Sequence, residues 1–122
     1  MRALALAAAL LLPLDAIAQE AFVLEVGGDT HLVELAAARS ISFGRDGSST
    51  VYVDDESREW LARATARNVG KTLTIRYGNI VATRPRIRGG VPGNLIHFGS
   101  DAPRSVHDAL LRSARSWSTG ER

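Results

Sequence analysis

Residues 68–87 read NVGKTLTIRYGNIVATRPRI, and this stretch decides the fold that the sequence predicts. Gly70 stands where a helix is expected to end, because glycine readily adopts the left-handed conformation that closes a last helical turn. Two runs rich in strand-forming residues follow. They are separated by Gly78-Asn79, which fits the two-residue turn of a β-hairpin. The stretch therefore predicts the end of a helix followed by two paired strands.

A helix is predicted before this hairpin. Asp54, Asp55 and Glu56 open it, because acidic side chains are favourable at the positive end of the helix dipole. Its apolar stripe recurs at spacings of three and four residues and consists of Trp60, Leu61, Ala64 and Asn68. The helix start also accounts for the acidic group, whose spacing does not match a calcium-binding loop.

The residues before that helix predict two further hairpins. Residues 21–26 are rich in strand formers and stop at 27–29, so that 31–35 can pair back onto them. Residues 36–39 fit either a helical turn or the entry to a strand. Residues 40–53 alternate polar and apolar side chains on both sides of a central turn, which predicts the second hairpin.

The sequence after residue 87 predicts one more strand and one more helix. A glycine-rich loop leads into a short β run at 94–98, and Ser100 or Asp101 is expected to cap the helix. The buried face of this helix repeats with helical spacing and consists of Val106, Ala109, Leu110, Ser113, Ala114 and Trp117. The order of elements predicts an α+β fold, a small mostly antiparallel sheet with two helices packed on one face.

Residues 1–18 have the features of a secretory signal. Arg2 supplies a positive start, an apolar run of about twelve residues follows, and Ala16-Ile17-Ala18 resembles the small residues before a cleavage site. The run is shorter than the ~20 residues that a membrane-spanning helix needs. We therefore expect cleavage after Ala18 and a periplasmic or secreted protein, with no membrane span once the signal is removed.

The predicted layout has four parts: the signal peptide at 1–18, a strand segment at 19–39, an α+β domain at 40–117 and a frayed tail at 118–122. A chain of 122 residues is long enough for one hydrophobic core. Lys and Arg number 15 against 13 Asp and Glu, and this net charge of +2 gives little reason to expect nucleic acid. The absence of cysteine excludes disulfides, thiolate metal sites and cysteine nucleophiles.

The order of motifs around residues 65–87 resembles the head subdomain of the first periplasmic domain of SecD, a subunit of the protein-export complex SecDF. A looser resemblance to the same subdomain extends over residues 40–117. The residues that carry the motif are Asn68, Val69, Gly70, Gly78, Asn79 and Pro85, with Gly89-Gly90 in the following loop. The resemblance implies the fold of that subdomain, here as a free-standing exported domain. It also implies contact with exported polypeptide or with the Sec machinery.

Some features of the family differ here. Gly78-Asn79 stands where the family has Asp-Gly, and Arg84 precedes Pro85 where the family has a small residue. The membrane helices and proton-relay carboxylates expected of SecD have no counterpart in this sequence. The resemblance therefore implies a fold and a protein contact, and it does not imply proton-driven translocation.

Arg84, Arg86 and Arg88 alternate along the second strand of the hairpin, so in an extended strand they share one face. In an uninterrupted hairpin that face would also carry the apolar residues of the first strand. Burying three unpaired guanidinium groups is too costly. The sequence therefore predicts either a strand that twists away beyond Thr83 or a bulge at Pro85 that exchanges the faces.

Two interpretations of this arginine stripe stay open. Charges on an edge strand deter unwanted pairing with other strands, and this alone is enough to explain them. Alternatively, Arg84, Arg86 and Arg88 form a contact for an anion or an acidic peptide, beside the loop of Gly89 and Gly90.

His31, His97 and His107 are the candidates for metal or acid–base chemistry, but they fall on separate predicted elements and are interpreted as solvated or core-edge side chains. No catalytic, phosphate-binding or dinucleotide-binding motif is present in the sequence. We expect no enzyme activity, no cofactor and no metal site. The leading hypothesis is a non-catalytic periplasmic module that contacts polypeptide or an envelope partner. The alternative is a periplasmic binder or enzyme that acts on an anionic small molecule through the arginine stripe and His97.

Overall fold

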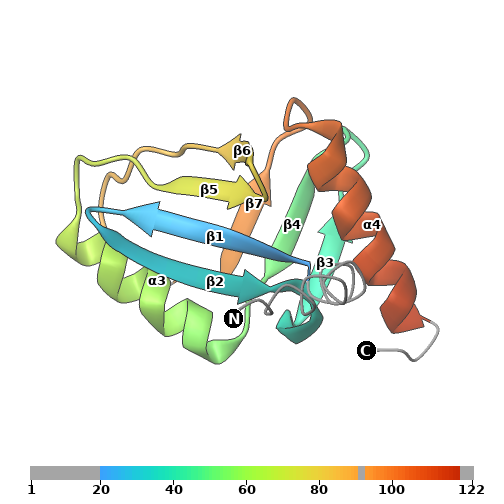
Figure 1. Ribbon diagram of the computed structural model, residues 1–122, viewed down its shortest axis with the longest axis horizontal. Coiled ribbons are helices and arrows are strands. Elements are labelled where there is room, and N and C mark those ends of the chain that lie inside the picture. The colour runs from blue at the N-terminus through green and yellow to red at the C-terminus, as the bar shows by residue number, and fades with distance from the viewer. Residues whose placement is uncertain (1–19, 91–92, 119–122) are drawn as a thin grey trace, which may run out of the picture.

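The structure is a computed structural model, and it describes residues 20–90 and 93–118 (Figure 1). Its elements in chain order are β1 (Ala21–Val26), β2 (Asp29–Glu34), the 3-10 helix η1 (Leu35–Ala37), β3 (Ser40–Phe43), β4 (Ser49–Tyr52), α3 (Asp55–Arg67), β5 (Thr74–Tyr77), β6 (Ile80–Thr83), β7 (Leu95–Phe98) and α4 (Arg104–Ser118). The α+β class is confirmed. The predicted signal peptide lies outside the described residues, as does the predicted tail from 119 onward. Within the described ranges, no helix is long and apolar enough to cross a membrane.

The strands of the described chain form two antiparallel sheets, in the orders β2-β1-β5-β6 and β3-β4-β7. Figure 1 shows the strands of the smaller sheet crossing steeply behind the larger one. The strands that the sequence analysis places in one sheet are thus divided between two. The division arises at β1, because its second edge pairs with β5, with Val23 opposite Arg76. The hairpin of β5 and β6 therefore joins the N-terminal strands and not β4.

Each helix lies against its own sheet. Helix α3 contacts β2 of the larger sheet, whereas α4 contacts β3 and η1 (Figure 1). Helix α4 begins at Arg104, later than the predicted caps at Ser100 and Asp101, which lie in the preceding turn. The carbonyl of Pro103 accepts hydrogen bonds from Val106 N–H at 3.0 Å and from His107 N–H at 3.4 Å, the latter with α-helical spacing. Pro103 fits this position because a helix start does not need its missing N–H.

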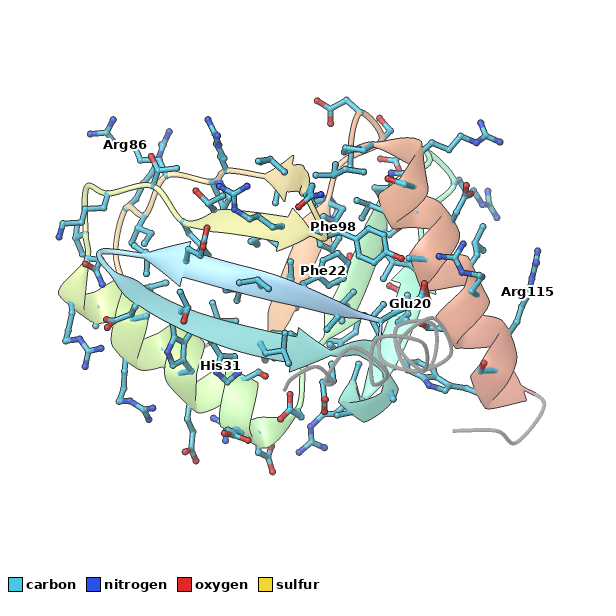
Figure 2. The ribbon with its side chains drawn as sticks, viewed as in Figure 1. Glu20, Phe22, His31, Arg86, Phe98 and Arg115 are labelled. Atoms are coloured by element: carbon cyan, nitrogen blue, oxygen red, sulfur yellow. The ribbon has the colours of Figure 1, made fainter. Side chains whose placement is uncertain are left out.

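The alternation of side chains in β1 builds the core. Phe22, Leu24 and Val26 are buried, and the residues between them are half-buried. The ring of Phe22 lies 5.0 Å from that of Phe98 in the smaller sheet and 5.8 Å from that of Tyr77. Figure 2 shows Phe22 and Phe98 side by side where the two sheets cross. Phe22 therefore joins the two sheets into one core.

The end of α3 follows the prediction and fixes the segment beyond the hairpin. Gly70 has a φ of 91°, the left-handed conformation expected there. The side-chain amide of Asn68 donates to the carbonyl of Ala64 at 2.8 Å, which satisfies a carbonyl in the last turn. Gly70 N–H donates to the carbonyl of Ile87 at 2.7 Å. This bond connects the helix end to the segment that carries the arginines.

Candidate functional site: an apolar groove beside a basic strand edge

A one-residue bulge interrupts the hairpin of β5 and β6. Arg76 pairs with Val81, whereas the preceding Ile75 pairs with Thr83, which leaves Ala82 as the extra residue. Ala82 is buried, and its small side chain suits a position where two residues face one. From Thr83 onward, each side chain faces the side opposite to the one it would take in an uninterrupted hairpin.

This shift places Arg84, Arg86 and Arg88 on the exposed outer face and turns Ile87 toward the interior, while Pro85 stays exposed and lines the groove described below. Ile87 is only 6% exposed, while the three arginines are exposed. Figure 2 shows Arg86 projecting from the margin of the molecule. Of the two predicted solutions the structure has the bulge. It lies before Pro85 and not at it, so the predicted position was wrong.

Residues 84–88, which we call the basic edge, continue the pairing irregularly beyond β6. Leu73 N–H donates to the carbonyl of Pro85 at 2.9 Å, and Ile87 N–H donates to the carbonyl of Lys71 at 2.8 Å. Pro85 has no N–H to donate to the carbonyl of Leu73, so one hydrogen bond of this ladder is missing. The regular strand therefore ends before the basic edge, although the two chain segments stay side by side.

The outer side of the basic edge has unused backbone groups. In antiparallel pairing, successive residues direct their N–H and C=O groups to opposite sides of the strand. Pro85 and Ile87 use theirs toward β5, so Arg84 and Arg86 direct theirs to the free side. β6 is the last strand of its sheet, and Figure 1 shows no described element beside it on that side. The basic edge can therefore accept another strand.

The positive charges of the arginines on the basic edge are not neutralised by described residues. None of the three forms an ion pair with any residue in the described ranges. Arg76, on the same outer face, pairs with Glu25 at 2.8 Å. Across the ladder Arg86 faces Thr72, which has no carboxylate to offer. The outer face thus presents three uncompensated positive charges along one strand.

An apolar groove of about 290 Å³ lies between the basic edge and β7, above α3. Its buried apolar lining consists of Leu61, Leu73, Ile75, Ile87 and Ile96. Arg86, Arg88 and His97 are also among the residues that line it. Of the predicted candidates, Arg86, Arg88, Gly89 and His97 line the groove, whereas Arg84 and Gly90 are not among its lining residues. The other lining residues are ones that sequence reasoning did not assign to a site. Those missed residues come from three separate elements, and no local pattern connects them.

β7 presents a second unused strand edge to the groove. Val53 N–H donates to the carbonyl of Asn94 at 3.0 Å, which marks these two residues as a hydrogen-bonded pair. The alternation then directs the backbone groups of Leu95 and His97 away from β4, and both residues line the groove. The groove therefore lies between two strand edges whose backbone groups are not used within the sheets.

The predicted glycines differ in what they do. Gly89 lines the groove in open space, and Gly90 lies beside Ala66 of α3, but neither has a positive φ. At the end of the same loop, Gly93 does require glycine. Its φ is 79°, and a side-chain carbon there would lie 2.5 Å from the carbonyl oxygen of Arg58. Gly93 holds the end of the loop against α3, which closes one side of the groove.

The histidines outside the groove have structural partners. His31 Nε2 lies 2.9 Å from Ser57 Oγ, and its ring stacks on Trp60 at 5.1 Å between β2 and α3 (Figure 2). His107 Nδ1 lies 2.9 Å from Ser49 Oγ. Both serines are 1% exposed, so neither hydroxyl can reach a substrate. In the part of the chain that the structure describes, no three His, Asp or Glu side chains gather as a metal site requires.

Fold and groove together define a small α+β domain in which two antiparallel sheets leave a groove between their edges. A search of solved structures finds this fold in SecDF, described as a membrane component that enhances protein export. The TM-score is 0.53 and the sequence identity 20%, over 69% of this chain. The matched region spans 40% of that SecDF chain, so the likeness concerns one part of it. No protein-family model matches the sequence, and no curated protein matches it either.

Proposed function

We propose that this protein is a non-catalytic exported module that contacts polypeptide as an accessory to protein export, with the architecture of the head subdomain of the first periplasmic domain of SecD. The observation that carries the proposal is the apolar groove between two strand edges with unused backbone groups. The fold likeness to SecDF, a component that enhances protein export, supports the same role.

The chemistry of the groove suits an extended chain. An unfolded polypeptide offers apolar side chains, which gain free energy when they leave water for a lining such as Leu73, Ile87 and Ile96. It also offers free N–H and C=O groups, which strand edges bind without regard to sequence. The groove volume is at the low end of the roughly 300–1,000 Å³ of small-molecule sites, and fits a few side chains.

Photo-crosslinking in cells tests the proposal. A photoreactive residue is placed at Pro85 or Leu95, which line the groove, and as a control at Arg63, on the exposed face of α3. We expect adducts with exported polypeptides from the two groove positions and few from the control position. Equal yields of random adducts from all three positions would overturn the proposal.

A second candidate function has one specific observation in its favour. Arg86, Arg88 and His97 line the same groove, as a binder or enzyme for an anionic small molecule would require. The ring of His97 is held by Thr50, with Nδ1 and Oγ1 3.0 Å apart. If this candidate is correct, replacing His97 and Arg86 together with alanine should abolish binding of a small anion. Unchanged binding in the double variant would remove it.

A further inference from the structure

The free side of the basic edge has the geometry of a strand acceptor with a charge requirement. We propose that it receives an extended polypeptide segment in which acidic residues alternate with apolar ones, paired as an added antiparallel strand beside residues 84–88. This inference rests on the proposed function and specifies which polypeptide segment is preferred.

The backbone register determines where each side chain of the incoming strand lies. The backbone N–H and C=O groups of Arg84 and Arg86 point away from β5, toward the free side of the strand. Their exposed side chains lie on the outer face of the sheet. In an antiparallel partner, the residues directly opposite them exchange two hydrogen bonds with them. Their side chains lie on the same outer face, with Cβ atoms about 4.5–5.5 Å apart. These are the positions where a carboxylate can meet a guanidinium.

The other residues of the incoming strand face the groove. Successive side chains of a strand point to opposite faces, so residues between the acidic ones point to the side of Pro85 and Ile87. That side is lined by the buried Leu73 and Ile96, and it has no carboxylate among its described lining residues. The incoming strand therefore needs apolar side chains at every second position.

Charge complementarity selects this occupant over other extended chains. The basic edge offers three guanidinium groups with no ion pair among the described residues. A segment with Lys or Arg opposite them is repelled, and like charges directly across a ladder are unfavourable. A segment with Glu or Asp gains charge-assisted, often bidentate hydrogen bonds. The arginines thus disfavour pairing of this edge with basic segments and favour pairing with acidic ones.

Binding of short synthetic peptides to the purified full-length chain tests the charge requirement. The probe alternates Glu and Val, and two reference peptides carry Ser or Lys in place of Glu. We expect the Glu peptide to bind about tenfold more tightly than the Ser peptide at low salt, and the advantage to shrink as salt screens the charges. The Lys peptide should bind most weakly.

A matched pair of triple variants locates the charge effect. One variant carries Arg84→Gln, Arg86→Gln and Arg88→Gln. The control carries the same change at three other exposed arginines, Arg45, Arg63 and Arg115, which form no ion pair with a described residue either. Both variants lose the same net charge. Only the first should lose the roughly tenfold preference for the Glu peptide, while both should keep the wild-type circular dichroism and melting temperature.

N-methylated peptides test the backbone pairing. Antiparallel pairing predicts that the N–H groups of the Glu residues bond to Arg84 and Arg86, whereas those of the Val residues point away. Methylating the Glu nitrogens should therefore abolish binding, and methylating the Val nitrogens should leave it within about twofold. Equal effects of the two methylated peptides would overturn the strand-addition proposal.

The outcomes separate this inference from the proposed function. If the Glu and Ser peptides bind equally well, and the basic-edge variant binds both like wild type, the charge requirement is wrong while polypeptide binding stands. If no peptide binds and the groove positions give no specific crosslinks, the proposed function fails as well. A salt-dependent preference that disappears equally in the control variant shows general charge attraction, and it also overturns the inference.

Discussion

Gly70 shows how a single residue sets the geometry that the site depends on. Its left-handed conformation lies in the turn that follows α3, where Lys71 N–H donates to the carbonyl of Asn68 at 3.0 Å, and its own N–H bonds to Ile87 on the basic edge. A side-chain carbon at this position would meet nothing within 4 Å, so the requirement for glycine comes from backbone conformation and not from crowding. The turn after α3 and its bond to the arginine segment thus depend on one φ angle.

Replacing Gly70 with valine should lower the free energy of unfolding by about 1–2 kcal/mol, because a branched side chain is strained at positive φ. Thermal or denaturant unfolding measures the change. Gly89→Val is the matched control, since Gly89 has open space around it and does not have a positive φ. Equal losses in the two variants would show that left-handed strain is not the cause.

Tyr77 connects strand β5 to the start of β1 and to α4. Its hydroxyl donates to Glu20 Oε1 at 2.8 Å, and Arg112 contacts the same carboxylate. Burial raises the pKa of Tyr77 above its ordinary value of about 10, and the hydrogen bond to Glu20 raises it further. A phenol whose pKa is raised in the folded state stabilises the fold below pH 10, and this contribution is lost as the pH rises through the folded value.

The free energy of unfolding should therefore fall more steeply above pH 10 in wild type than in Tyr77→Phe. The variant should be less stable at pH 7, because it loses the hydrogen bond to Glu20. Denaturant unfolding across pH 8–11 provides the comparison. Parallel curves for the two proteins would show that Tyr77 does not couple folding to pH.

At the scale of the elements, the bulge in β6 separates the charged from the apolar face of the hairpin. Ala82 can be deleted without changing the faces, because Val81 then pairs with Arg76 and Thr83 with Ile75 in a regular ladder. Deleting Pro85 is different, because no pairing then keeps Arg84, Arg86 and Arg88 all on the outer face. At least one guanidinium is forced toward the core.

We therefore expect the Ala82 deletion to fold, with a loss of about 1 kcal/mol or less from the missing small side chain. The Pro85 deletion should lose about 3 kcal/mol or more, or fail to fold, because it buries an unpaired charge. Unfolding by denaturant distinguishes the two. An Ala82 deletion as damaging as the Pro85 deletion would show that the bulge has a role beyond setting the faces.

Much of the structure of the individual elements could be predicted from local sequence. The turn at Gly78-Asn79 and the left-handed turn at Gly70 after α3 follow from backbone preferences that need no tertiary context. The outward position of the arginines followed from the cost of burying charge. The location of the bulge did not, because whether Ala82 or Pro85 takes the extra position depends on packing against the core.

At the scale of the whole molecule, the two-sheet arrangement and the groove were beyond sequence reasoning. The pairing of Val23 with Arg76 and the contact between the rings of Phe22 and Phe98 join residues far apart in the chain. The groove combines α3, the hairpin of β5 and β6, the basic edge and β7, whose residues share no periodicity. Amphipathic patterns identify which side chains are buried, but they do not identify which buried surfaces meet.

Export should leave a chain that begins at Gln19, because Ala18 ends the cleavage motif. β1 begins at Ala21, so cleavage there leaves the first strand intact. Intact-mass measurement of protein from a periplasmic fraction checks the new N-terminus. Recovery of the protein only in membranes, with residues 1–18 retained, would contradict the prediction.

The central position of β1 affects the order in which the chain can fold. β1 can pair with β2 as soon as both have been synthesised, but its other edge pairs with β5, which is made much later. Until Arg76 arrives, the early hairpin has an open side in the middle of what becomes the larger sheet. The larger sheet can therefore be completed only after β5 has been synthesised. Any other strand that reaches the open edge of β1 before then competes with β5 for it.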